Sequence, residues 1–437
     1  MHGVFTRNCI VYYNSQMNLK TILGLATVFI ITTQYQKLKK LYNILTFFNE
    51  SSIVDNFRSV TNVGIPYATA QHGQVAEFEE DKCEPLPTEF TFIYTFKNKT
   101  YNLQDWLKSQ WVTGLVVLKI ESPTKARLLH ESYYLGNDAK TKTISWSINK
   151  SVVSALIGIA ITEQKINSVD DDVVVYAPQL KNSGYDGVKI KDVLQMSSGV
   201  CFDEDYDNIF SDINKLGYWL ALGFDIDSFI CKLHSNKEPG IVHNYISSDT
   251  QVLGMVLKGA VGQSLTSYLE EKLWKRCGFE SDCDWLLDNE KNAMELAFGT
   301  LNTSTRDYAR FGWLYLNEGL SPLDGTKIID KKWIRDSVKC EKSYLKPCYP
   351  DRFGYGYQWW LPANNDNRIE IQGDYLAIGV YGQFIYVDPS NQIVIAMNSA
   401  DPNYNKKTDI DGTNIGEIEA VEAYRSIAQY YSNINIK

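Results

Sequence analysis

This chain of 437 residues has few of the residues and motifs that build metal sites or bind nucleic acid. Its five histidines are scattered and it has no C-x-x-C pair, so we expect no zinc site or other metal site. The formal charge is −9 at pH 7, and no basic block or alternation of basic and aromatic residues is present. This composition argues against a nucleic-acid partner.

Several catalytic and cofactor-binding motifs are also missing from the sequence. The chain has no G-x-S-x-G, no P-loop and no G-x-G-x-x-G, and it shows no internal repeat or low-complexity tract. Readings as a kinase, a dinucleotide-binding enzyme or a hydrolase with a nucleophile elbow therefore lack support, and no cofactor is implied. What the chain does have is length enough for two or three structural units, and a high aromatic content that suits lined clefts as well as cores.

The N-terminus carries one apolar run, Ile22–Thr33, between Lys20 and a group of lysines at 37, 39 and 40. The run is shorter than the roughly 20 residues of a spanning helix, and no small-x-small cleavage site follows it. With Met17 as an alternative start, residues 17–36 resemble an uncleaved export signal, which predicts an exported, periplasmic or membrane-anchored protein. The alternative is a buried helix of a cytosolic protein.

The eight cysteines leave two readings open. Cys277 and Cys283 lie close together in the sequence, as do Cys340 and Cys348, and each pair is in a turn-rich stretch that suits a local disulfide. Export makes such disulfides the more economical reading, and free buried thiols are the alternative.

Patterning along the chain predicts an α+β fold. We expect strands at 91–96, 114–120 and 128–134, helices between 166 and 290, then strands at 355–361, 375–380, 383–387 and 392–398, and a closing helix at 417–431. Both chain ends then contribute to one antiparallel sheet flanked by helices, with a helical insertion between them. The expected units are a signal segment and connector at 1–50, a sheet domain at 51–165 and 291–437, and a mostly helical domain at 166–290. Residues 37–88 are interpreted as a polar connector.

One serine and one lysine stand out at the start of the longest apolar, helix-like run, residues 151–161. Ser147 and Lys150 are three residues apart, so on a helix they share one face. Burial makes the amine easier to deprotonate, and the helix N-terminus favours an oxyanion. This is the arrangement of Ser-x-x-Lys acyl-transfer enzymes. The alternative is a capping serine beside a lysine that reaches solvent, and two further Ser-x-x-Lys matches, at 122–125 and 343–346, open no apolar helix.

The motifs that follow in order carry a resemblance. After Ser147-Ile-Asn-Lys150 come Pro239-Gly240, Tyr245-Ile-Ser247, Gly254 and a late strand with Gly379. This order resembles the penicillin-recognising serine hydrolases, in their class C β-lactamase and esterase branch. Several stretches are similar to the nylon-oligomer (aminohexanoate-dimer) hydrolases, among them ISWSINKSVVSALIGIAI, YDGVKIKDVLQMSSGVCFDEDY, NYISSDTQVLGMVL, STRDYARFGWLYLNEG and AIGVYGQFIYVDP.

The resemblance implies a β-lactamase-like fold and a role for each matching residue. Ser147 is the expected nucleophile, with Lys150 and Tyr245 as proton-transfer groups and Tyr245 held partly as a phenolate. The backbone N–H groups of Ser147 and Val380 form the expected oxyanion hole. Gly379 and Tyr206 are expected at the substrate, although Tyr206 could equally be a packing residue of an acidic loop.

One position departs from the resemblance. The family strand usually carries a Lys or His two residues before its glycine, where the cation meets a substrate carboxylate, and this chain has Ala377. We therefore expect an uncharged small-molecule ester or amide as substrate rather than a penicillin. The alternatives are a D,D-peptidase or β-lactamase-like enzyme, and a catalytically silent binding protein on the same fold. The sequence gives no oligomeric state, and residues 17–36 could serve as a membrane tether.

Overall fold

The fold is built on one large sheet. The computed structural model describes residues 35, 38–80, 85–347, 353–363, 373–407 and 415–434, and within these the sheet has eight strands. From edge to edge they are β10 (Phe353–Tyr355), β11 (Trp360–Pro362), β12 (Tyr375–Gly379), β13 (Gln383–Asp388), β14 (Ile393–Ser399), β5 (Val112–Ser122), β6 (Lys125–Tyr133) and β2 (Phe78–Glu79). All neighbours are antiparallel except β2 and β6.

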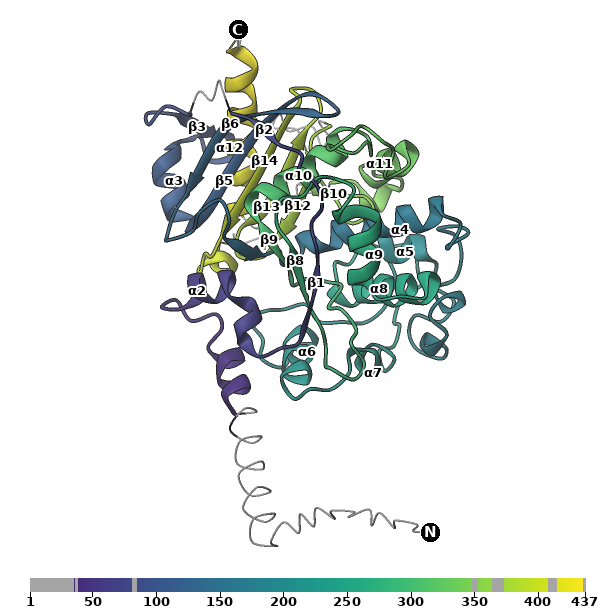
Figure 1. Cartoon of the computed structure of the whole chain (residues 1–437). Helices are drawn as coiled ribbons and strands as arrows, with labels where there is room; N and C mark the ends of the chain where they lie inside the picture. The colour runs from purple at the N-terminus through teal and green to yellow at the C-terminus, as the bar shows by residue number, and fades with distance from the viewer. Residues whose placement is uncertain are drawn as a thin grey trace, which may run out of the picture.

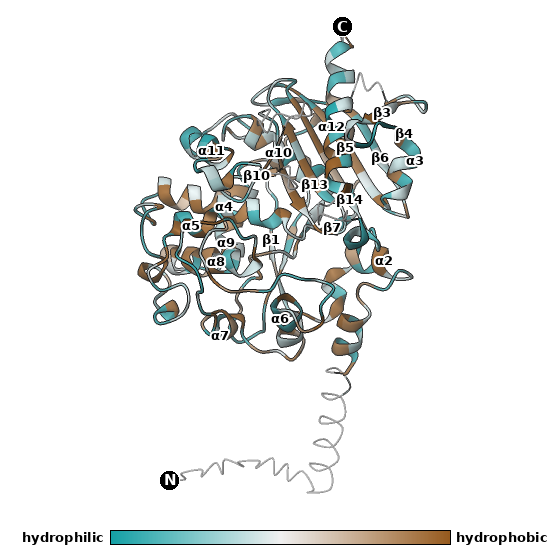
Figure 2. Cartoon of the chain, turned by 180° about the vertical axis from the view of Figure 1, so that it is seen from behind, coloured by the Kyte–Doolittle hydropathy of each residue, from teal (hydrophilic) through white to brown (hydrophobic). Residues whose placement is uncertain are grey.

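Helices cover both faces of this sheet (Figure 1). α12 (Ile415–Asn433) and α3 (Leu103–Ser109) pack on one face, and α10 (Thr305–Leu316) and α4 (Ile148–Thr162) pack on the other. Because both faces are covered, β13 and β14 are buried at every residue. Figure 2 shows the same strands largely in the brown of hydrophobic residues. The prediction that strands from both chain ends form one sheet is confirmed, with β5 and β14 pairing directly.

Two smaller sheets and a helical region complete the described chain. One sheet has the order β1 (Tyr67–Ala70), β8 (Cys283–Leu286), β9 (Leu301–Ser304) and β7 (Lys142–Ile144), and the other pairs β3 (Thr91–Tyr94) with β4 (Lys99–Asn102). The remaining α-helices with assigned bounds are α2 (Ile53–Arg58), α5 (Ile190–Leu194), α6 (Asp212–Ala221), α7 (Ile226–Ile230), α8 (Ser247–Val261), α9 (Leu265–Leu269) and α11 (Lys331–Ser337). A further helical stretch at 38–45 precedes α2. The domain limits predicted from the sequence stay predictions.

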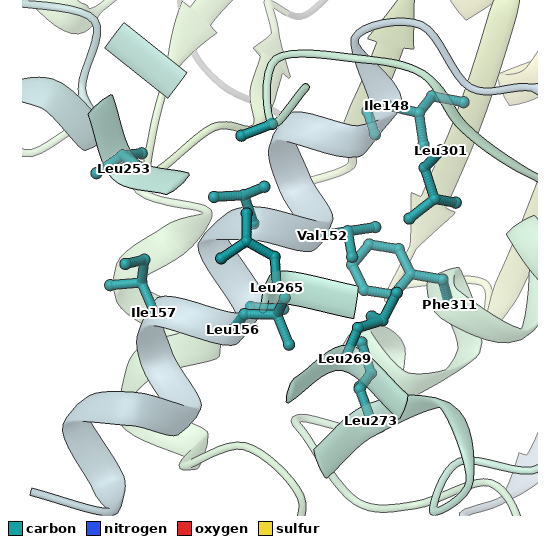
Figure 3. Close-up of a cluster of buried hydrophobic side chains, with 14 of the residues drawn as sticks. Ile148, Val152, Leu156, Ile157, Leu253, Leu265, Leu269, Leu273, Leu301 and Phe311 are labelled. Atoms are coloured by element: carbon teal, nitrogen blue, oxygen red, sulfur yellow. The ribbon is translucent and has the colours of Figure 1, made fainter. Parts of the chain in front are cut away.

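α4 is the central helix of the core and positions its own N-terminus. Thirteen of its fifteen residues are buried, which is the pattern of a helix with no solvent-facing side. Figure 3 shows Ile148, Val152 and Leu156 of α4 among side chains of α9, α10 and β9. Gly254 of α8 packs tightly against Ala297. A Cβ on Gly254 would lie 2.6 Å from the Cβ of Ala297, which is too close for a side chain. Packing on several sides therefore holds the first turn of α4 in place.

Three expectations need correction. The interpretation of residues 37–88 as a polar connector is wrong for the described part of that segment, because Phe47, Phe57 and Val63 belong to the main core. The strand expected at 355–361 is interrupted, since Gly356 and Gln358 lie in a tight reversal between β10 and β11, where Gln358 has φ 65°.

The third correction concerns the cysteines. Cys277 and Cys283 are separate, buried free thiols, so the local disulfide between them is absent. Each fills a position in the main apolar core, which is the alternative that the sequence left open. Cys340 is also a free thiol, with its Sγ 3.0 Å from the carbonyl oxygen of Leu345. Its proposed partner, Cys348, lies outside the described residues.

Candidate active site

Ser147 lies at the N-cap of α4, but its side chain does not cap the helix. Its hydroxyl is instead 3.1 Å from Nζ of Lys150, one turn further on. Lys150 is 1% exposed, so the amine does not reach solvent. These two observations exclude the capping-serine alternative and leave a hydroxyl and an amine in direct contact.

Lys150 has three neighbours that orient its amine. Besides Ser147 Oγ, Nζ lies 2.7 Å from the carbonyl oxygen of Phe298 and 3.2 Å from Oγ of Ser247. Burial lowers the pKa of Lys150 to about 8, and the negative charge of Glu204 opposes part of this shift. A neutral amine has two N–H groups and one lone pair. If the N–H groups bind Phe298 O and Ser247 Oγ, the lone pair points at the hydroxyl of Ser147.

Glu204 is a functional candidate that the sequence analysis missed. The Oγ–H of Ser247 donates to Glu204 Oε1 over 2.5 Å, and the backbone N–H of Ser247 donates to Oε2 over 2.8 Å. Because the Ser247 proton is committed to Glu204, its oxygen is free to accept from Lys150. Tyr206 also donates to Glu204 Oε1, over 2.8 Å. The motif Glu204-Asp205-Tyr206 looked like a solvated acidic loop, and only its distance from Ser247 in the fold distinguishes Glu204.

Tyr245 lies beside the same pair of residues but as a neutral phenol. Burial raises its pKa above the ordinary value, and a hydrogen bond with the Ser147 side chain only partly opposes this. The negative charge of Glu204 raises the pKa further. Nζ of Lys150 is 5.3 Å from the centre of the Tyr245 ring, so the amine lies over the ring face. The raised pKa favours a neutral phenol, which is a proton donor, over the expected partial phenolate.

The end of β12 packs against the loop that carries Ser147. A Cβ on Gly379 would lie 2.5 Å from the carbonyl oxygen of Ser145 and 3.1 Å from the backbone nitrogen of Ser147. No side chain fits there, so the close approach requires glycine. Val380, the next residue, lines the same cavity as Ser147. The two backbone groups expected to form an oxyanion hole therefore come from segments that are in contact.

A cavity of about 220 Å³ opens beside Ser147. Tyr206, Ser247 and Val380 also line it, so three of the six site residues predicted from the sequence meet in this cavity. The other three, Lys150, Tyr245 and Gly379, do not line it. Most of its other walls are apolar side chains. Among the described residues that line it there is no Lys, Arg or His. Ala377 is not one of the lining residues, since it is 1% exposed and part of the main core.

Trp146 and His243 lie next to catalytic candidates in the sequence, but in the structure both pack against aromatic rings. Trp146 has φ 44°, an uncommon conformation for a large side chain, and its ring lies among Phe47, Phe57 and Tyr381. His243 is half-buried against the ring of Tyr355, and burial lowers its pKa to about 4. It is therefore neutral at physiological pH. Among the described residues, no three His, Cys, Asp or Glu side chains come together to hold a metal ion.

This group of side chains has the spacing of a Ser-x-x-Lys site, and comparison with known proteins gives the family of the chain. Residues 125–420 match the family described as Beta-lactamase, so the chain belongs to the β-lactamase family of hydrolases. The family domain includes Ser147, Lys150, Tyr245 and Val380.

Individual relatives are distant. A 6-aminohexanoate-dimer hydrolase from Paenarthrobacter ureafaciens is 25% identical over 293 residues, which cover 64% of this chain and 71% of the relative. A solved structure described as a 6-aminohexanoate-dimer hydrolase from Bacillus anthracis has a TM-score of 0.74 at 20% identity, covering 89% of this chain and 97% of the other. A family VIII carboxylesterase has a TM-score of 0.54 at 17% identity, covering 74% and 96%. The expected β-lactamase-like fold is confirmed.

Proposed function

We propose that the protein is a serine hydrolase that cleaves an uncharged ester or amide through an acyl-enzyme on Ser147. The observation that carries the proposal is the contact of Ser147 Oγ with a fully buried lysine amine whose pKa is lowered to about 8. A buried lysine without a function is costly, because its charge loses the solvation of water. The 6-aminohexanoate-dimer hydrolase named above, which is similar over 64% of this chain, supports a hydrolytic reaction.

In the proposed reaction, Lys150 and Tyr245 carry every proton that is transferred. Ser147 Oγ attacks the carbonyl carbon while its proton moves to the neutral Lys150 amine. The backbone N–H groups of Ser147 and Val380 hold the developing oxyanion. The leaving group departs with a proton supplied by Tyr245, and the proton on Lys150 restores the phenol. In the second half a water loses its proton to the same pair, attacks the acyl carbon, and Ser147 regains its proton.

The residue at position 377, an alanine, favours a substrate without a carboxylate beside the scissile bond. Alanine offers no cation to a carboxylate beside the scissile bond, and the described cavity walls add none. A charged hydrogen bond of that kind contributes about 1.5–3 kcal/mol, so penicillins and acyl-D-Ala-D-Ala lose that much binding relative to a family member that has the cation. A neutral ester should therefore exceed a chromogenic cephalosporin in kcat/KM on the same preparation. A cephalosporin advantage would favour the antibiotic-recognising alternative.

Substitution of the nucleophile tests the mechanism. Ser147→Ala should abolish turnover of p-nitrophenyl butyrate while circular dichroism and the melting temperature stay near those of the parent, because the lost hydroxyl is small and does not cap α4. Ser154→Ala is a matched control, since it removes another buried hydroxyl of α4. Retained turnover in a folded Ser147→Ala protein would overturn the mechanism and leave the silent-binding alternative.

We further propose that the protein is exported and held at a membrane surface by its N-terminal segment. The apolar run at 22–33 lies outside the described residues. The helical stretch that follows it exposes Leu38, Tyr42 and Leu45 at spacings of four and three, with exposed fractions of 66%, 67% and 61%. Such an apolar stripe suits the interface of a lipid bilayer, and the nearby lysines favour anionic lipid. No helix in the described part of the chain is long and apolar enough to cross a membrane.

Vesicle flotation tests this placement. Full-length protein should float with vesicles of mixed neutral and anionic phospholipid, and a triple Leu38→Glu, Tyr42→Glu, Leu45→Glu variant should float less. Val175→Glu is the control, because Val175 is equally exposed, at 61%, and lies outside this helix. Equal flotation of the parent and the triple variant would reject a role for the exposed stripe. Full activity of the natural protein in the cytosol would contradict export.

A further inference from the structure

The cavity beside Ser147 is lined mostly by apolar side chains, with Asn214 and Thr300 as polar lining residues besides Ser147, Ser247 and Tyr206. Most of its apolar walls come from three parts of the chain: the N-terminal segment, α6, and the group Leu286, Leu296 and Phe298. The side chains from the N-terminal segment are Ile44, Phe47, Phe48, Val60, Val63 and Ile65. A cavity of this composition favours a hydrocarbon chain over a charged or hydrogen-bonding group.

The N-terminal wall is attached to the catalytic loops by stacked rings. Phe48 and Tyr381 have ring centroids 5.1 Å apart, and Phe57 and Trp146 have theirs 5.5 Å apart. Trp146 and Tyr381 are next to Ser147 and Val380 in sequence. The wall lies before residue 125, where the family match begins, so it is contributed by chain outside the matched family domain. The apolar wall and the oxyanion-hole candidates therefore form one continuous surface.

The position of Tyr245 indicates which part of a substrate enters the cavity. Its ring packs with Tyr355 and Trp360, at centroid distances of 6.0 and 5.1 Å, and it does not line the cavity. The leaving group takes its proton from Tyr245, so it departs toward that aromatic cluster. The acyl group, on the other side of the carbonyl carbon, then faces the apolar walls.

We propose that this cavity binds an extended apolar acyl chain, so that the substrate class is an uncharged ester or amide of a medium-chain fatty acid. The inference rests on the acyl-enzyme mechanism proposed above for its choice of the acyl side. Burying each methylene group of such a chain contributes up to roughly fourfold in binding. Acetyl esters leave the cavity walls uncovered and should be the poorer substrates.

Gly217 of α6 offers a way to fill the cavity without disturbing the fold. It lines the cavity together with Ile213 and Leu220, which are one turn away on either side of the same helix face. A Cβ built on Gly217 meets no atom within 4 Å. Leucine is also a better helix former than glycine, so Gly217→Leu should fold at least as well as the parent.

The test compares p-nitrophenyl octanoate with p-nitrophenyl acetate. In the parent, kcat/KM for the octanoate should exceed that for the acetate at least tenfold. In Gly217→Leu that ratio should fall at least fivefold, because the added side chain occupies the space of the acyl chain. Lys215→Leu is the matched control, since it adds the same side chain at an exposed position of α6 that does not line the cavity, and its ratio should equal that of the parent.

The outcomes separate this inference from the mechanism. A parent ratio near one, or a ratio unchanged in Gly217→Leu, with turnover still dependent on Ser147, would overturn the acyl-chain site and leave the mechanism standing. Absence of Ser147-dependent turnover of both esters would reject the mechanism. Calorimetric binding of octanamide and acetamide then decides the site by itself: octanamide binding that weakens in Gly217→Leu supports it, and no preference for octanamide overturns it.

Discussion

At the scale of single residues, the account depends on the proton of Lys150. The amine is buried, and its hydrogen-bond partners orient it toward Ser147 only if it is neutral. An ordinary lysine holds its proton at pH 7, so a pKa of about 8 makes a useful fraction of base available. All three Ser-x-x-Lys matches contain a serine and a lysine. The burial of Lys150, which lowers its pKa, distinguishes this site chemically.

The pH dependence of kcat/KM follows from this pKa. Protonated Lys150 cannot accept the proton of Ser147, so activity should increase about tenfold per pH unit below pH 8 and level off above it. His243 does not interfere, because its pKa near 4 keeps it neutral over this range. Initial rates with p-nitrophenyl butyrate between pH 6 and pH 9.5, corrected for spontaneous hydrolysis, give the profile. A flat profile across this range would contradict Lys150 as the base.

Glu204 should act as a positioning residue with a measurable electrostatic effect. Glu204→Gln removes the negative charge that raises the pKa of Lys150, so the midpoint of the pH profile should move below that of the parent. It also removes the carboxylate that fixes Ser247, and kcat should fall at least tenfold. Asp205→Asn changes the adjacent, exposed carboxylate and should alter neither property. An unshifted midpoint in Glu204→Gln would assign Glu204 a purely structural role.

At the scale of elements, the site depends on the contact between β12 and the N-terminus of α4. Gly379 permits that contact, because any side chain would meet the carbonyl oxygen of Ser145. Gly379→Ala should displace the strand end from Ser147, reduce kcat at least tenfold through the oxyanion hole, and destabilise the fold by about 1–3 kcal/mol. Gly217→Ala, where a Cβ meets nothing, is the control for the thermal melt. Wild-type turnover in Gly379→Ala, measured beside its thermal melt, would contradict this arrangement.

The elements also show what the sequence could predict. The central strands β5, β12, β13 and β14 have largely apolar sequences, and α4 has an apolar run of eleven residues, so the sequence predicts each of them to within three residues at each end. Ser147, Lys150 and Tyr245 were selected because their spacing and order match a known pattern. The interruption at Gln358 was not predictable, since it rests on a positive φ whose cause is tertiary: the Gln358 side chain bonds with Thr250 and the backbone of Leu194.

The residues that were missed depend on contacts between distant parts of the chain. Glu204 accepts a hydrogen bond from Ser247, which is 43 residues away in the sequence, and no periodic pattern connects the two positions. Phe47 and Phe57 lie in a stretch that looks polar on average, and only packing against Trp146 shows that they belong to the core. The neutral state of Tyr245 likewise follows from burial, which the sequence does not reveal.

At the scale of the whole molecule, the N-terminal segment divides into a dispensable part and an essential part. A chain that begins at residue 38 keeps the core side chains and should remain folded and active. A chain that begins at residue 66 loses five buried side chains, those of Phe47, Ile53, Phe57, Val60 and Val63. At about 1.5–3 kcal/mol each, their loss is comparable to the whole stability of a typical domain. Thermal melts and ester turnover of the two truncations check this, and a stable, active chain from residue 66 would contradict it.

The central claim is that Ser147 is a nucleophile activated by Lys150. The most direct measurement is labelling of the full-length protein with a fluorophosphonate, followed by peptide mapping in a mass spectrometer. The account predicts one phosphonylated serine, Ser147, with labelling that becomes faster as the pH rises toward 8 and that is lost in Lys150→Met. Labelling of a different serine, or no labelling of a folded protein that still hydrolyses esters, would contradict it.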